Sequence, residues 1–213
     1  MTENETFIYE SIFNQIRMGF LSLDEIQENI LEEIEDNDFA DEISEEWAFD
    51  KIKEEYQKLL AESKQWKSPT DTERLIKAFD ELCDENILAL HNAGYTTTDG
   101  EYEVVEVERE LQENEVESDG YCFYHGQDLA RAIAVEDSNL FIAFQKVDNS
   151  DDATTIEIGK RVAEVLINND FRIIWNGSAK TKIEIPGFKW QKIFDEDARD
   201  LQDYSEVVDR MLQ

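Results

Sequence analysis

The first third of the chain places apolar residues at the spacing of an α-helix within a strongly acidic stretch. Ile26, Ile30 and Ile34 recur every fourth residue among carboxylates. This spacing puts the three side chains on one face, so the stretch is predicted to be an amphipathic helix. Ser22 and Glu25 have the spacing of a capping box, which predicts that the helix begins directly after Ser22.

Two further helices are predicted before residue 86. The first ends near Trp66, ahead of Pro69, and a capping box of Thr70 and Glu73 opens the second. Their apolar positions are Ile43, Trp47, Tyr56, Leu59, Leu75, Phe79 and Leu82. Residues 1–69 are therefore predicted to form an acidic helical region packed on the main domain.

Beyond residue 86, short apolar runs alternate with helical patterns. The runs cover residues 87–90, 121–125, 140–144, 171–175 and 182–185, and the helices residues 101–114, 127–134 and 156–169. Thr154 and Glu157 resemble a capping box for the last of these helices. Runs 87–90 and 140–144 are apolar throughout, which is typical of central strands covered on both faces.

The order of these elements predicts the fold class. Residues 70–213 are expected to form an α/β domain, with α+β as the alternative, around a mixed sheet of about five strands. Asn176-Gly177 lies between two of the runs and favours a hairpin with a type I′ turn. A C-terminal helix using Leu201, Val208 and Leu212 completes the domain.

Charge narrows the range of partners. The 213 residues contain 52 acidic and 20 basic side chains, a formal net charge of -32. Such a chain repels nucleic-acid phosphates and anionic membranes, whereas a basic protein is an acceptable partner. The N-terminus lacks the pattern of a signal peptide, and no apolar run reaches the length of a membrane span. With two cysteines and no CxxC pair, a cytoplasmic location is expected.

Both histidines of the chain follow apolar runs. If the strands that end before His91 and at His125 are parallel neighbours, both histidines lie at the carboxyl edge of the sheet, where ligands bind in open α/β folds. Asn176 would join them if residues 171–175 form another parallel strand. The predicted ligand-binding residues are His91, Asn92, Tyr95, Asp99, His125, Gln127, Asp128 and Asn176.

Two kinds of chemistry remain open at this edge. Two histidines with one or two carboxylates can hold a divalent metal, or act as a base and the group that orients it. The candidate catalytic residues are His125, His91, Asp128 and Asp99. Each also has a structural interpretation, because histidine is common in turns and aspartate is favoured at helix starts. No metal, nucleotide or hydrolase motif accompanies them, so the sequence identifies no cofactor.

Lys180, Lys182, Lys189 and Lys192 form a small basic island in this acidic chain. Internal carboxylates are expected to pair with these lysines. Trp190 lies beside them and is expected near the surface, whereas the other three tryptophans are expected in the core.

Three segments together resemble a known family. They are "SPTDTERLIKAFDELCDENILALHNAGYTTTDG", "GYCFYHGQDLARAI" and "VAEVLINNDFRIIWNGSAKTKIEI". They are similar to a bacterial domain-of-unknown-function family (number 6891), over roughly residues 66–192, with weaker likeness near residues 16–26. The resemblance implies a bacterial, cytoplasmic setting and no established activity. It directs attention to Asp71, Arg74, His91, Asn92, Gly94, Tyr95, Asp99, His125, Gln127, Asp128, Trp175 and Asn176.

Two functions are consistent with these observations. The first is a binding or regulatory module whose acidic surface docks a basic partner, a contact that salt should weaken strongly. The second is a small-ligand or metal-dependent enzyme, which requires His91 and His125 to lie within one ligand's reach on one side of the sheet. The charge of the chain favours the first, and no catalytic role is assigned.

Overall fold

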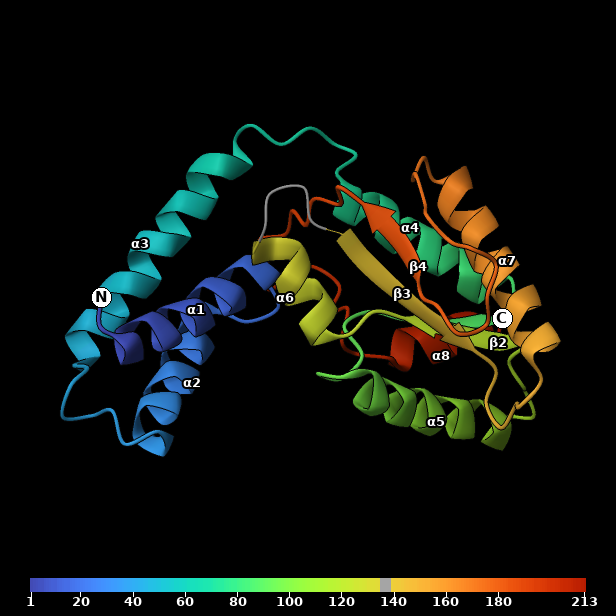
Figure 1. Cartoon of the computed structure of the whole chain (residues 1–213), viewed down its shortest axis with the longest axis horizontal. Helices are drawn as coiled ribbons and strands as arrows, with labels where there is room; N and C mark the ends of the chain where they lie inside the picture. The colour runs from blue at the N-terminus through green and yellow to red at the C-terminus, as the bar shows by residue number, and fades with distance from the viewer. Residues whose placement is uncertain (135–138) are drawn as a thin grey trace. The chain divides into compact units, whose positions relative to one another are not determined.

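The computed structural model describes residues 1–134 and 139–213, which form two compact units (Figure 1). A helical unit comprises Met1–Ser68 together with Trp190–Arg199. An α+β unit comprises Pro69–Lys189 together with Asp200–Gln213.

The helical unit contains α1 (Glu3–Met18), α2 (Leu23–Asp36) and α3 (Glu45–Ser63). The predicted capping box of Ser22 and Glu25 is present at the start of α2, which confirms that prediction. The buried core is built mainly from isoleucines: Ile8, Ile12, Ile16, Ile26, Ile30, Ile34, Ile43 and Ile52, with Ala48 and Leu59. The three α2 isoleucines predicted to share a face are thus all in the core.

The returning segment Trp190–Arg199 completes this unit. The indole Nε1–H of Trp190 donates to the Met18 carbonyl at 3.0 Å, and its ring lies 5.7 Å from that of Phe20. The tryptophan is half-buried in this position. Residues far apart in the sequence therefore contribute to one small core.

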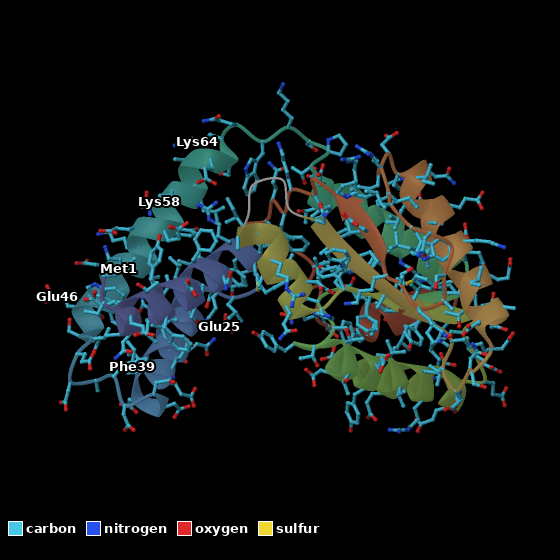
Figure 2. All side chains as sticks on the ribbon, in the orientation of Figure 1. Met1, Glu25, Phe39, Glu46, Lys58 and Lys64 are labelled. Atoms are coloured by element: carbon cyan, nitrogen blue, oxygen red, sulfur yellow. The ribbon has the colours of Figure 1, made fainter. Side chains whose placement is uncertain are left out.

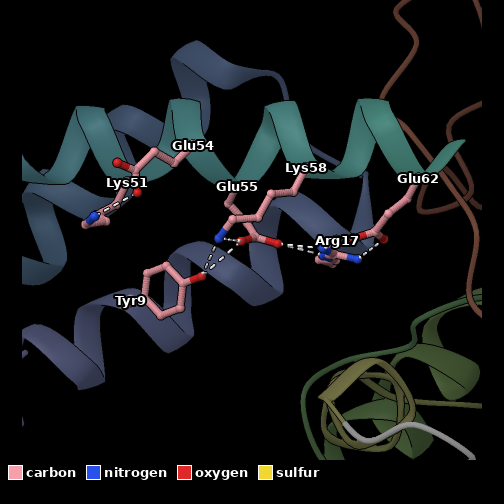
Figure 3. A network of polar contacts seen from close by, with 7 residues as sticks. All are labelled: Tyr9, Arg17, Lys51, Glu54, Glu55, Lys58 and Glu62. Carbon is pink, nitrogen blue, oxygen red and sulfur yellow. Dashed lines mark hydrogen bonds and ion pairs between the residues drawn. The ribbon is translucent and has the colours of Figure 1, made fainter.

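A buried carboxylate links α1 to α3 (Figure 3). Glu55 on α3 is 1% exposed and accepts hydrogen bonds from Arg17 at 2.7 and 2.8 Å, from Tyr9 at 2.9 Å and from Lys58 at 3.1 Å. Burial alone would raise the pKa of Glu55, but these donors outweigh it and the pKa lies below its ordinary value. Glu55 is therefore held ionised between the two helices.

The α+β unit runs α4 (Asp71–Asp84), β1 (Ile87–Leu90), α5 (Thr97–Glu113), β2 (Gly120–Phe123), α6 (Gly126–Ala134), β3 (Asn139–Gln145), α7 (Asp152–Asn168), β4 (Ile183–Pro186) and α8 (Ser205–Met211). In the described part of the chain the sheet has four strands in the order β1-β2-β3-β4. β1 and β2 are parallel, and the other two pairs are antiparallel. With one parallel pair out of three, the fold is α+β.

The prediction of about five strands is wrong at residues 171–175. This run makes one isolated antiparallel bridge, between Ile174 and Glu184, and forms no strand. Between the two runs Asn176 organises local turns: its Oδ1 accepts from the Ser178 N–H at 3.0 Å and the Thr181 hydroxyl at 2.7 Å. Glu184 of β4 pairs with Phe141 of β3 and also bridges Ile174, so the expected hairpin is reduced to this one bridge.

Several boundaries also differ from the sequence prediction, and caps explain two of them. α5 begins at Thr97 because Thr96 and Asp99 form a capping box. α7 begins at Asp152 because Asp151 caps it, not the pair Thr154 and Glu157. The C-terminal helix begins only at Ser205, so the buried Leu201 precedes it.

The predicted central position of residues 87–90 is also wrong. β1 lies at the edge of the sheet, although all four of its residues are buried. β3 is central in the order, yet its residues alternate between buried and half-buried. In this protein, a run that is apolar throughout therefore indicates that the strand is buried, but not whether it is central or at the edge of the sheet.

A different helix packs against each face of the sheet. A Cβ on Gly159 of α7 would lie 2.5 Å from the ring of Phe144, so α7 packs tightly on the face that carries Phe144. A Cβ on Gly100 of α5 would lie 2.4 Å from the ring of Phe123, so the first turn of α5 approaches the other face closely at this glycine. Because successive strand residues point to opposite faces, Tyr121 and Phe123 share the α5 face.

Candidate functional site

The loops that follow β1 and β2 are joined by backbone hydrogen bonds. The Ala93 N–H donates to the Tyr124 carbonyl at 2.9 Å, the Gly126 N–H to the Gly94 carbonyl at 2.9 Å, and the Gln127 N–H to the Tyr95 carbonyl at 3.1 Å. β1 and β2 are parallel neighbours, which is the condition on which the predicted site depends. Both histidines follow the carboxyl ends of neighbouring strands.

His91 lies in the core. It is 2% exposed, its ring stacks on Phe79 of α4 with centroids 4.5 Å apart, and its Nδ1 is 3.2 Å from the Tyr124 hydroxyl. Aromatic rings enclose it on the face that α4 covers. This is the environment of a histidine with a packing role.

His125 has polar neighbours. It is 3% exposed, and its Nε2 lies 2.8 Å from Lys182 Nζ, 3.0 Å from Asp128 Oδ2 and 3.1 Å from Thr97 Oγ1. Its Nδ1 accepts the backbone N–H of Asp128 at 3.3 Å, which caps the first turn of α6. Three elements thus meet at one imidazole: α5, α6 and the segment before β4.

The strand register explains why the two histidines have different neighbours. Leu90 pairs with Phe123, so His91 is aligned with Tyr124 and not with His125. Tyr124 and His125 are consecutive, and consecutive residues of an extended segment point to opposite faces. The structure brings both histidines to one edge of the sheet and gives them contacts with different residues.

Nδ1 of His125 accepts a backbone N–H, which places the proton of the neutral ring on Nε2, facing Asp128 Oδ2. The Lys182 ammonium lies 2.8 Å from the same Nε2 because Asp128 pairs with both groups, and a protonated Nε2 accepts no hydrogen bond from it. Burial lowers the pKa of His125 below its ordinary value of 6.5. The positive charges of Lys182 and Arg131 also lower it, against the opposing effects of Asp128 and Asp99. His125 is therefore neutral at pH 7.

Asp128 is the charge centre of this cluster. It is 2% exposed, and its carboxylate is paired with Lys182 through Oδ2 and with Arg131 through Oδ1, the latter at 3.1 Å. One negative charge thus faces two positive charges and a neutral imidazole. Among these four side chains the positive charges outnumber the negative one, although the chain has a net charge of -32, and Asp99 is a further negative charge that acts on His125.

A cavity of about 290 Å³ adjoins the cluster. Its lining includes Thr97 and Lys182, the two residues that connect it to His125. The sheet supplies two register pairs on the α5 face, Tyr121 with Gln145 and Phe123 with Ala143. The full lining is Thr97, Glu101, Tyr121, Phe123, Ala143, Phe144, Gln145, Ala179, Lys180, Thr181 and Lys182.

Two lining segments are held in place by polar side chains. The Ser178 carbonyl accepts the Trp175 indole N–H at 3.1 Å, and Asn176 fixes the turns that lead to Lys182. Gln145 is oriented through its Oε1, which accepts from Thr155, from Asn149 at 3.0 Å and from the Lys146 N–H at 3.1 Å. Its amide nitrogen donates to no other described residue. The cavity is thus lined by donors whose backbone or side-chain positions are fixed.

The other predicted site residues have local roles. Asn92 occupies a turn with φ of 48°, and Tyr95 is 65% exposed beside Gly126. Asp99 completes the capping box of α5, and hydrogen bonds from Thr96 lower its pKa. The backbone of Gln127 joins the two edge loops. Of the predicted set, His125 and Asp128 belong to the polar cluster, and Asn176 organises a lining loop.

Sequence reasoning missed much of the lining. Four lining residues belong to no recognisable sequence motif, so nothing distinguished them from their neighbours in the predicted helices, strands and loops. They are Thr97, Glu101, Tyr121 and Gln145. Lys182 could be singled out from the sequence, because a lysine in so acidic a chain was expected to pair with an internal carboxylate. Its ion pair with Asp128 confirms this expectation. Lys192, from the same island, belongs to the helical unit, where its ammonium lies 5.8 Å from the centre of the Phe20 ring.

The cluster does not have the geometry of a nucleophile activated by histidine. In such a relay the hydroxyl and the carboxylate contact different ring nitrogens. Here Thr97, Asp128 and Lys182 all contact Nε2, and Nδ1 accepts a backbone N–H. Within residues 1–134 and 139–213, no group of three histidine, cysteine or acidic side chains is placed to hold a metal.

The protein has a helical unit and an α+β unit, and the α+β unit contains a cavity beside the buried residues Asp128 and His125 and the half-buried Lys182. The chain belongs to the family described as Domain of unknown function (DUF6891), whose model matches residues 1–194. The match includes the helical unit's first 68 residues, where the resemblance expected from the sequence was weak and limited to residues near 16–26 and from 66 onward. No curated protein and no solved structure matches the chain. Among the described helices, none is long and apolar enough to cross a membrane.

Proposed function

We propose that the α+β unit binds a small molecule bearing a carboxylate in the cavity beside Lys182. The observation that carries the proposal is the charge of the lining, where Lys180 and Lys182 outnumber the single carboxylate of Glu101. Lys182 pairs with the buried Asp128 carboxylate, which also pairs with Arg131, a residue outside the lining. In a chain of net charge -32, a local positive site favours an anion that the rest of the surface repels.

The chemistry of the lining supports a carboxylate. Lysine ammonium groups, the Thr97 hydroxyl and the Gln145 amide nitrogen are hydrogen-bond donors, and charge-assisted bonds to a carboxylate are the stronger kind. The volume of about 290 Å³ lies at the lower end for ligand pockets and suits a small metabolite. His125 and Asp128 act as positioning residues, because both contact the ammonium group of Lys182 and fix its place beside the cavity.

The proposal is tested by nuclear magnetic resonance of the ¹⁵N-labelled full chain. Small carboxylates, with and without amino groups, are titrated into the protein, and uncharged amides of the same size serve as comparison ligands. Carboxylates should shift the amide signals of Thr97, Tyr121 and Lys182 in a saturable manner. Uncharged amides should not shift these signals.

Two variants define the role of the positive charge. Lys182→Met should weaken carboxylate binding by about tenfold or more, because a charge-assisted hydrogen bond contributes about 1.5–3 kcal/mol. Lys160→Met is the matched control, since Lys160 lies on α7 outside the cavity and pairs with Glu157. Equal binding by the two variants would contradict the proposal.

A second candidate function is favoured by the surface of α2. Asp24, Glu25, Glu28, Glu32, Glu35 and Asp36 are exposed, and the helix contains no basic residue. Figure 2 shows Glu25 and Glu46 among the side chains that extend from the helical unit. We propose that this acidic surface docks a basic protein. A cytoplasmic location, also a proposal, fits two buried cysteines that are free.

Salt dependence tests this second function. A model basic protein or a lysine-rich peptide is titrated at about 0.02 M and 0.3 M salt by calorimetry. Binding through exposed charges should weaken steeply across this range, because screening shortens the reach of each charge. Charge reversal of Glu28 and Glu32 to lysine should weaken binding further, while reversal of Glu164 and Glu157 on α7 should not.

A further inference from the structure

We infer that the ligand of this cavity is a zwitterion: a small amino acid or a close analogue with a free ammonium and a free carboxylate. The inference rests on the proposed function and adds a requirement for positive charge on the ligand. It follows from two charged residues of opposite sign that line the cavity without pairing to each other.

Glu101 supplies the negative charge. It lies on α5 one turn beyond Thr97, is exposed and lines the cavity. Among the described residues its carboxylate has no hydrogen-bond or ion-pair partner. It is also close enough to Tyr121 to add to the effect of burial in raising the pKa of that phenol. The carboxylate is therefore available to a cationic group within the cavity.

Lys180 supplies the unpaired positive charge. Its backbone N–H donates to the Ser178 hydroxyl at 3.1 Å, which fixes the turn, but its ammonium forms no ion pair within the described residues. Lys182, by contrast, is paired with Asp128. Glu101 and Lys180 form no ion pair with each other.

A ligand with one charge satisfies only part of this lining. A simple carboxylate gains from Lys180 and Lys182 but is repelled by Glu101, because like charges at short range disfavour each other. A ligand with both charges removes that repulsion and complements Glu101 as well. The remaining surface includes Tyr121, Phe123 and Ala143, which suits an apolar side chain on the ligand.

The test compares whole ligands with ligands that lack one charge. Leucine and phenylalanine are titrated into the full chain by calorimetry, together with their N-acetyl derivatives and their amides. The N-acetyl compounds keep the carboxylate alone, and the amides keep the ammonium alone. The free amino acids should bind about tenfold or more tightly than either derivative, the size expected for one charge-assisted contact.

Variants of the two unpaired lining residues test which charge of the ligand each residue contacts. Glu101→Gln should weaken the free amino acid and leave the N-acetyl derivative unchanged or tighter, so the preference for the free amino group is lost. Lys180→Met should weaken the free amino acid and reduce the preference over the amide. Glu110→Gln, an exposed position farther along α5, and Lys160→Met are controls that should keep both preferences.

The outcomes separate this inference from the proposal on which it rests. If N-acetyl derivatives bind as tightly as free amino acids, the inference of a zwitterionic ligand is overturned, whereas the proposal that the cavity binds a carboxylate is retained. If amides bind as tightly as free amino acids, both are overturned, because the ligand carboxylate contributes nothing. If neither these compounds nor other small carboxylates bind, both are overturned too. Loss of preference in Glu101→Gln but not in Glu110→Gln supports the zwitterion.

Discussion

At the scale of single residues, Glu55 has the clearest energetic role. Replacing it with glutamine keeps the shape and removes the charge that Arg17 and Lys58 face. Breaking one partner of a buried pair costs about 3–5 kcal/mol, and the lower end is expected because Glu62 also pairs with Arg17. Urea unfolding followed by tryptophan fluorescence and circular dichroism should therefore show a loss of about 3 kcal/mol for Glu55→Gln.

The adjacent Glu54 provides the control (Figure 3). Its carboxylate is exposed and pairs with Lys51 at 2.7 Å on the same helix. Glu54→Gln also removes one negative charge, but at a solvent-exposed position, where ion pairs contribute little to stability. This variant should therefore leave the free energy of unfolding almost unchanged. Equal losses for the two variants would show that net charge, and not the buried network, is responsible.

A pH dependence follows from His125. Its pKa in the folded protein is lowered, chiefly by burial, from the ordinary value of 6.5 that applies to the unfolded chain. As the pH falls through 6.5, the unfolded chain binds a proton that the folded protein does not, so stability should decrease. The imidazole signal of His125, assigned with His125→Gln, should titrate below 6.5. A midpoint above 6.5 would contradict the buried, neutral ring.

The same comparison should be made by unfolding. Between pH 7.5 and 5.5 the wild-type protein should lose more stability than His125→Gln, which has no group to protonate at this position. Other groups titrate in both proteins, so only the difference between their slopes is informative. Parallel slopes would mean that His125 has the same proton affinity in the folded and unfolded states.

At the scale of elements, Gly100 shows how α5 reaches the sheet. Alanine favours a helix over glycine by about 1 kcal/mol, so propensity alone predicts that Gly100→Ala stabilises the protein. The new Cβ would instead lie 2.4 Å from the Phe123 ring and 2.7 Å from the Ala93 carbonyl. Overpacking of this kind costs about 1–3 kcal/mol, so a net loss of stability is expected in denaturant unfolding.

This variant should also alter the cavity. Thr97 and Glu101 flank Gly100 on α5, so moving the helix away from Phe123 moves both lining residues. Thr98→Ala, at an exposed position in the same turn, should change neither stability nor ligand binding appreciably. A stabilised Gly100→Ala protein would show that α5 and β2 are separated by more than this contact.

Local signals explain which elements the sequence predicted well. The capping boxes at Ser22 and Thr70 and the runs that become β1, β2 and β3 depend on residues close in the chain. The hairpin was predicted less well: residues 183–186 pair along their length with the distant strand β3, and residues 171–175 contribute only the bridge from Ile174 to Glu184. Propensity for a strand is decided by such pairing, which a single sequence does not display.

The candidate site divides in the same way. His125 and Asp128 lie three residues apart, so their contact was within reach of sequence reasoning. Lys182 reaches them from 54 residues farther along the chain, and Thr97 from a different helix. The register of β1 against β2, which separates the surroundings of His91 from those of His125, also becomes visible only once strands are paired.

At the scale of the whole molecule, the net charge of -32 opposes compactness. Unfolding lets like charges move apart, so self-repulsion favours the unfolded chain. Raising the salt concentration from about 0.01 M to 0.15 M shortens the screening length from about 30 Å to about 8 Å. The melting temperature, measured by circular dichroism, should therefore rise across this range.

The identity of the salt separates screening from ion binding. Sodium chloride and choline chloride should raise the melting temperature equally at equal ionic strength, because screening depends on charge and not on coordination. A rise with sodium alone would indicate a bound cation. The same salt step that stabilises the free protein should weaken a complex with a basic partner, since both effects arise from the same carboxylates. A melting temperature that stays constant would mean that the carboxylates are already neutralised, which would remove the electrostatic basis for docking such a partner.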